Sequence, residues 1–115
     1  MFGCRINPKI ACNNPVELNR ALLSSGFAYD VKNRIEQLKI VNVLLPQIRD
    51  LRRIGSAAAD ICHVATGLVD GYFETGLYEW DLAAAELIAR EAGAIVTTRP
   101  WHGLNLTVAA GPHLF

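Results

Sequence analysis

Two carboxylates and one helix start are the features of this sequence whose residue types and spacing could do chemistry. Glu74 ends an expected strand, and Asp81 follows it by seven residues at the expected start of a helix. Carboxylate oxygens are the ligands that Mg²⁺ prefers, and a bound Mg²⁺ can be shared with a phosphate. Gly55, Ser56 and Ala57 open another helix, whose free backbone amides could receive an anion or a ligand oxygen.

Each of these residues also has a purely structural interpretation. Asp81 could be the N-cap of its helix, with Trp80 as a packing anchor, and Gly55 and Ser56 could form a helix cap and nothing else. Glu74 could be a solvated strand end. On residue types alone the structural role is favoured for Asp81 and for the Gly55–Ser56 pair. For Glu74 the two roles are equally supported.

Alternating strands and helices would have to position these residues, which predicts an α/β layered architecture. In such folds ligands gather beyond the carboxyl ends of parallel strands, where both helix starts and Glu74 would meet. A short helical turn is expected within 15–20, and loops at 75–79 and 99–105. Strands are expected at 9–12, 21–27, 49–54, 68–74, 94–98 and 106–110, and helices at 31–45, from Ser56 to Gly67, and from Trp80 to Gly93.

Helical periodicity supports the three helices, because residues three, four and seven apart share one face. Asp30 is placed to cap the first helix, and Pro46 ends it. The series that share a face are Val31, Ile35, Leu38, Asn42 and Leu45 in the first helix, Ala58, Ile61, Cys62 and Ala65 in the second, and Ala84, Leu87, Ile88 and Ala92 in the third.

Composition excludes several classes of function. The 115 residues suffice for one domain, and eleven basic against eleven acidic residues argue against nucleic acid or anionic lipid as a partner. No apolar run approaches the ~20 residues that span a bilayer, so we expect a cytoplasmic protein with no membrane partner. Three cysteines without a Cys-x-x-Cys pair indicate reduced packing residues rather than a disulfide framework or a zinc site.

Four segments of the chain together resemble the inositol monophosphatase family. They are RIGSAA at 53–58, VATGLVDGYFE at 64–74, WDLAA at 80–84 and IAREAG at 88–93. The Trp-Asp-x-Ala-Ala element that runs into Arg-Glu-Ala-Gly is the C-terminal signature of that family. Upstream, residues 7–9 and 25–30 are similar to the turn before its central strands and to the strand that leads into a long helix.

The resemblance implies a fold and a site. The fold would be a layered α/β/α sandwich with a mixed sheet, the C-terminal half of the inositol monophosphatase/fructose-bisphosphatase-like fold. Asp81 would bind a catalytic Mg²⁺, Glu74 would accept a hydrogen bond from a substrate hydroxyl, and Gly55, Ser56 and Ala57 would contact the substrate. The implied protein is a Mg²⁺-dependent homodimeric phosphatase that hydrolyses inositol monophosphate or a related small phosphate monoester.

The departures from the family pattern are equally informative. Ala85 and Ala94 stand where the family usually has glycine. The N-terminal half, with most of the metal ligands, and the last helix have no counterpart in residues 1–115. We therefore expect a single partial domain, catalytically incomplete by itself and without a catalytic residue beyond the metal ligand. The alternative is a non-catalytic dimerisation or interaction module derived from the phosphatase fold, which a monomeric chain at micromolar concentration would contradict.

Overall fold

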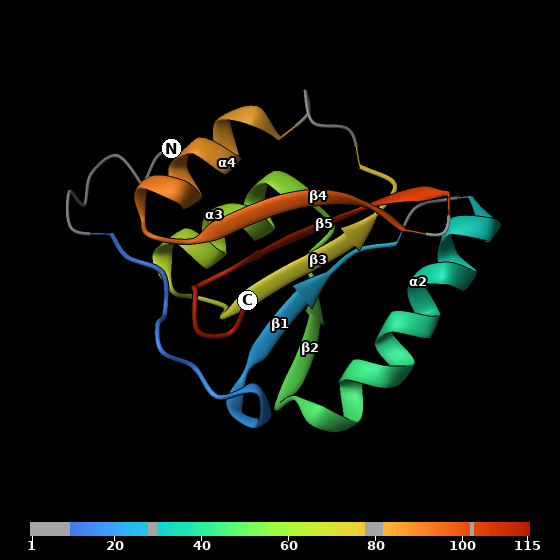
Figure 1. The fold of residues 1–115 in the computed structure, drawn as a ribbon, viewed down its shortest axis with the longest axis horizontal. Helices are drawn as coiled ribbons and strands as arrows, with labels where there is room; N and C mark the ends of the chain where they lie inside the picture. Colours follow the sequence, from blue (N-terminus) through green and yellow to red (C-terminus); the bar gives the residue numbers. More distant parts are fainter. Residues whose placement is uncertain (1–9, 28–29, 78–81, 102) are drawn as a thin grey trace.

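A mixed five-stranded sheet forms the middle layer of the computed structural model, which describes residues 10–27, 30–77, 82–101 and 103–115 (Figure 1). The strand order is β2-β1-β3-β5-β4. The first three strands are parallel, whereas β5 runs antiparallel to both of its neighbours. The bounds are β1 (Leu22–Ser25), β2 (Asp50–Arg53), β3 (Gly71–Thr75), β4 (Ile95–Trp101) and β5 (Leu104–Ala110).

Helices cover both faces of this sheet, which confirms the expected α/β/α layering. Helix α2 (Val31–Leu44) packs on one face, and α3 (Ala57–Thr66) and α4 (Ala83–Glu91) lie together on the other (Figure 1). Two short 3₁₀ turns, η1 (Leu18–Arg20) and η2 (Leu45–Gln47), precede β1 and follow α2.

The ends of the helices follow their sequence signals. The Asp30 carboxylate accepts from the backbone N–H of Lys32 at the start of α2, and Ser56 Oγ accepts from the N–H of Ala59 at the start of α3. Gly67 ends α3 with φ 83°, a left-handed conformation that glycine adopts without steric cost. These signals are local, so the sequence alone placed them.

Two of the expected strand and loop segments are wrong. Residues 10–12 of the expected strand at 9–12 form no strand, and Lys9 lies outside the described residues; instead the Cys12 N–H donates to the Ala92 carbonyl at 2.9 Å. Most of the expected loop at 99–105 belongs to a hairpin, in which β4 and β5 pair as far as Trp101 and Leu104. Pro100 lies within β4, where proline is tolerated because β4 is an edge strand.

Two of the expected helical faces are also wrong. The apolar series of α2 faces solvent, with Leu38 57% exposed, and Gln37 and Val41 are buried instead. In α4 the buried residues are Ala85 and Ala89, whereas Leu87 is 59% exposed. The apolar residues of α2 are spread around the helix rather than gathered on one face, so periodicity alone could not identify the buried face. In α3 the buried residues are Asp60, Ile61, Val64 and Ala65, and Ala58 is exposed.

Each face of the sheet carries its own apolar cluster. The cluster under α3 and α4 includes Leu22, Ile61 and Tyr72, and Cys12 and Cys62 pack against it as the sequence predicted. The cluster under α2 includes Leu23, Val41 and Phe73. Among the described residues no helix is both long and apolar enough to cross a membrane.

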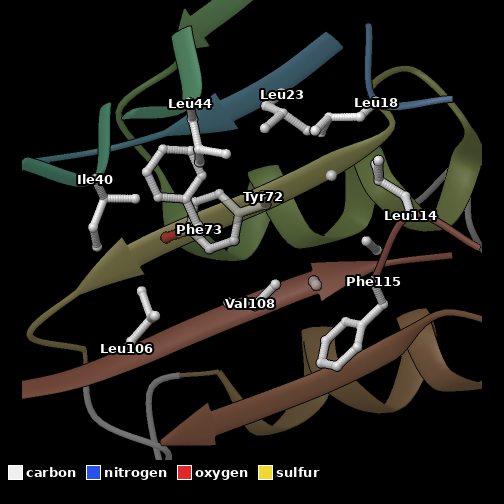
Figure 2. Close-up of a pocket in the computed structure, with 13 residues that line it drawn as sticks. Leu18, Leu23, Ile40, Leu44, Tyr72, Phe73, Leu106, Val108, Leu114 and Phe115 are labelled. Carbon is white, nitrogen blue, oxygen red and sulfur yellow. The ribbon is translucent and has the colours of Figure 1, made fainter. Parts of the chain in front are cut away.

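An apolar groove of about 200 Å³ lies on the α2 face, beside the helix. Figure 2 shows side chains from α2, β3 and β5 pointing into it, together with those of the last two residues of the chain. The labelled lining residues are Leu18, Leu23, Ile40, Leu44, Tyr72, Phe73, Leu106, Val108, Leu114 and Phe115. Helix α2 thus covers one part of this face of the sheet and leaves another part open.

Candidate active site

The carboxyl ends of the three parallel strands lie side by side, as the prediction of a site at this edge requires. Ser25, the last residue of β1, pairs with Arg53 of β2 and with Phe73 of β3. Gly55 and Ser56 lie in the segment that connects the end of β2 to α3. Glu74 is the second-last residue of β3. The structure therefore brings the expected helix start and the expected carboxylate to one edge of the sheet.

The turn from β2 into α3 presents exposed backbone. Gly55 has φ 97°, and a Cβ atom there would have no neighbouring atom within 4 Å. Ser56 adopts extended backbone angles and caps the helix through its Oγ, at 3.2 Å from the N–H of Ala59. The first amides of a helix have no intrahelical acceptor, so the N–H of Ala57 is available to a ligand oxygen. Both interpretations of this segment, cap and substrate contact, are compatible with this geometry.

The half-buried carboxylate of Glu74 is held by a hydrogen bond to one of its two oxygens. The Tyr72 hydroxyl donates to Glu74 Oε1 at 2.6 Å, and both side chains point to the α3 face because they are two residues apart in β3. Burial raises the pKa of Glu74, while the Tyr72 hydrogen bond and the nearby Arg53 charge lower it. Because one oxygen is already anchored, the other is left to accept a hydrogen bond. This arrangement argues against the interpretation of Glu74 as a merely solvated strand end.

A second acid, Asp60, lies near Glu74 and was not identified from the sequence. Its side chain is 1% exposed on the inner face of α3. Burial raises its pKa to about 6, the neighbouring Glu74 charge adds to the increase, and the Ser24 hydroxyl and His63 oppose it. The signal in the sequence was an aspartate beside Ile61 on an apolar helix face, a position where an unpaired acid is rare.

A buried glutamine on the opposite face of the sheet was also missed. Gln37 of α2 is 0% exposed and bonds to Ser25, Gly26 and Thr75. These residues surround Glu74, since Thr75 follows it and a Cβ on Gly26 would overlap the Glu74 carboxylate. The spacing of residues in α2 offered no signal for it, because polar and apolar residues are spread around the helix.

The described residues do not by themselves form a metal site. Among them, no group of three or more His, Cys, Asp or Glu side chains could hold a metal ion. Asp81, the expected Mg²⁺ ligand, lies outside the described residues together with Trp80. The nearby carboxylates are hard oxygen donors of the kind that Mg²⁺ accepts, but Glu74 and Asp60 are fewer than a cage requires.

Comparisons with known proteins agree with the resemblance seen in the sequence. The model of the inositol monophosphatase family matches residues 2–111. An inositol-1-monophosphatase of Mycobacterium leprae is 47% identical over 107 residues, which cover 90% of this chain and 37% of that protein. A Nus factor SuhB of Vibrio cholerae is 48% identical over 92 residues, covering 79% and 34%.

A solved structure gives the same result for the fold. Mycobacterium tuberculosis SuhB superposes with a TM-score of 0.80 at 45% identity, covering 91% of this chain and 42% of that one. The chain thus spans less than half the length of the relatives it matches. On the family match, these identities and the shared fold, this chain belongs to the inositol monophosphatase family.

Proposed function

We propose that this chain forms the substrate-hydroxyl side of a Mg²⁺-dependent phosphatase that hydrolyses inositol monophosphate or a related small phosphate monoester. The observation that carries the proposal is the Glu74 carboxylate, fixed through Oε1 by Tyr72 at the edge of the sheet where α3 begins. Family membership and relatives named inositol-1-monophosphatase support it. The proposal further includes a cytoplasmic protein that acts as a homodimer, with neither nucleic acid nor membrane as a partner.

The residues of this chain would divide the work of binding. Glu74 would accept a hydrogen bond from a substrate hydroxyl and so orient the ester. The N–H groups at Ser56 and Ala57 would donate to substrate oxygens, assisted by the helix dipole. Asp81 would hold Mg²⁺, which supplies activation of water and stabilisation of the leaving oxygen in this class of enzyme. The remaining metal ligands would come from a part of the protein outside residues 1–115, which form one partial domain.

The experiment measures phosphate release from inositol monophosphate by the complete protein, with and without Mg²⁺. We expect Asp81→Asn to reduce kcat at least about 100-fold, because the metal loses a charged ligand. Glu74→Gln should mainly raise KM. The matched control is Glu91→Gln, a charge-neutralising change on the exposed side of α4. Unchanged activity of Asp81→Asn would refute the metal role, and unchanged kinetics of Glu74→Gln would refute the hydroxyl-binding role.

A second candidate is the non-catalytic interaction module. The exposed apolar side chains of α2 favour it, since Val31, Leu38 and Val43 are each more than half exposed and water-exposed apolar area promotes association. The same assay separates the two candidates. A complete protein that releases no phosphate at any Mg²⁺ concentration, yet sediments as a defined oligomer, would support the module and overturn the phosphatase.

A further inference from the structure

All the hydrogen-bond donors and acceptors of the Gln37 side chain are used at the ends of β1 and β3, next to Glu74. Its Nε2 donates to Ser25 Oγ at 2.6 Å and to the carbonyl of Gly26. Its Oε1 accepts from the backbone N–H and from the Oγ1 of Thr75, each at 2.8 Å. A primary amide has two donors and two acceptor lone pairs, so all four are satisfied in this buried position.

The side-chain amide of Gln37 lies where the backbone pairing between β1 and β3 ends. The pairing of β1 with β3 ends at Ser25 and Phe73, so Glu74 and Thr75 pair only with β5 on their other side. Beyond Ser25, the side chain of Gln37 joins the Gly26 carbonyl to the Thr75 N–H across the gap. Ser25 Oγ, in turn, donates to the Phe73 carbonyl at 2.6 Å. The bridge therefore fixes the separation of the two strand ends from the α2 face.

The Glu74 carboxylate occupies the other face of the same gap. A Cβ on Gly26 would overlap Glu74 Oε1, which means that the carboxylate lies directly over the Gly26 α-carbon. The same oxygen accepts from the Tyr72 hydroxyl. Because the backbone on either side of Glu74 is held through Phe73 and Thr75, a change in the gap would move the carboxylate relative to both Gly26 and Tyr72.

We propose that Gln37 is a positioning residue for the Glu74 carboxylate, acting through the sheet from the side opposite the site. Its amide bridge sets the gap between the end of β1 and the end of β3 in which that carboxylate sits. This role rests on the proposed function of Glu74 as acceptor for a substrate hydroxyl. Glutamate in place of Gln37 would have no donor for the Gly26 carbonyl, so the bridge requires an amide rather than an acid of the same shape.

The test is a double-mutant cycle on KM for inositol monophosphate in the complete protein. Gln37→Met keeps the shape and removes all four hydrogen bonds, and we expect it to raise KM about tenfold with a smaller change in kcat. In the Glu74→Ala background the same substitution should change KM by less than about twofold, because the group that it positions is gone. Gln37→Glu should behave like Gln37→Met.

Asn13→Ala is the matched control for loss of stability. It removes two partly buried hydrogen bonds, to the carbonyl of Gly67 at the end of α3 and to Asp70 Oδ1 just before β3, away from the carboxyl ends of the parallel strands. We expect it to lower the melting temperature while KM stays unchanged. If Asn13→Ala raises KM as much as Gln37→Met does, or if Gln37→Met still raises KM tenfold without Glu74, general loosening explains the effect and the positioning role is refuted.

Two further measurements keep the proposal testable. Thr75→Val removes one of the four hydrogen bonds and should raise KM in the same direction by a smaller factor, which covers the case in which Gln37→Met does not fold. A crystal structure of the Gln37→Met or Thr75→Val protein should show the Glu74 carboxylate displaced from the Tyr72 hydroxyl, and an unmoved carboxylate would overturn the proposal. If Glu74→Ala leaves KM unchanged, the proposed function fails, and the crystal structure alone decides whether Gln37 positions this side chain.

Discussion

At the scale of single residues, the candidate site brings the buried acid Asp60 near the half-buried Glu74. Burial raises the pKa of both carboxyls, and the neighbouring Glu74 charge raises that of Asp60 further, while the Tyr72 hydroxyl donates a hydrogen bond to Glu74. The neighbouring charges also raise the pKa of the Tyr72 hydroxyl, after burial as the main cause, so it stays a hydrogen-bond donor. Neither Asp60 Oδ1 nor Ser24 Oγ finds a partner of normal geometry among the described residues.

Asp60 should make the stability of the fold depend on pH. Its pKa is about 6 in the folded chain and 3.8 ordinarily, so the folded state binds more protons between these values. The free energy of unfolding should therefore fall as pH rises from about 4 to about 6, by at most about 3 kcal/mol. Asp60→Asn removes this contribution.

Urea midpoints of both proteins between pH 4 and pH 7 provide the measurement. We expect similar midpoints at pH 4 and a growing advantage of Asp60→Asn above it. Glu74 contributes in both proteins, so the comparison isolates Asp60. Curves that stay parallel across the whole range would show that the carboxyl of Asp60 titrates normally in the folded chain.

At the scale of elements, the site depends on how β2 passes into α3. The left-handed Gly55 turns the chain and Ser56 caps the helix, which leaves the first amides of α3 facing the strand ends. A negative charge at position 56 can distinguish a capping role of Ser56 from a contact with the substrate phosphate. An acidic residue caps a helix well but repels a phosphate.

Ser56→Asp is the variant that makes this separation. We expect it to keep the free energy of unfolding, because the carboxylate can accept from the Ala59 N–H in place of Oγ. It should raise KM about tenfold, equivalent to ~1.4 kcal/mol, if the incoming phosphate faces this helix start. Ser56→Ala, the control, should lose ~1 kcal/mol of stability with little change in KM. An unchanged KM in Ser56→Asp would leave Ser56 with the capping role alone.

At the scale of the whole molecule, the described residues form only one side of the candidate site. The carboxyl ends of β1, β2 and β3 bring together the Glu74 carboxylate and the start of α3, but the described residues supply no metal cage. The relatives are more than twice as long as the part that matches this chain. We expect a site that lacks most of its metal ligands to bind a phosphate ester only weakly.

Residues 1–115 alone should therefore bind Mg²⁺ poorly. Calorimetric titration is expected to give a dissociation constant weaker than about 1 mM, because one or two carboxylates cannot replace most of the hydration shell of the ion. No phosphate release should be detectable. Micromolar binding of Mg²⁺ by this chain would show that the remaining ligands are present within it.

Several features of the fold could be predicted from the sequence because their causes are local. The capping residues Asp30 and Ser56 and the left-handed Gly67 act within one helical turn, and they fixed the ends of α2 and α3. Alternation of strand and helix signals gave the layered class of the fold. The family resemblance selected Glu74 and the helix start at Gly55, which the structure places at one edge of the sheet.

Other features were decided only by tertiary structure, because their causes are contacts between distant segments. Which face of α2 is buried depends on the sheet beneath it, and the sequence of that helix is apolar on more than one side. Gln37 bonds to Thr75, 38 residues away, and Asp60 is buried against the face of the sheet that carries Glu74. Residue type and spacing chose the chemical groups, whereas the packing of the helices on the sheet decided which of them are desolvated, paired and held in place.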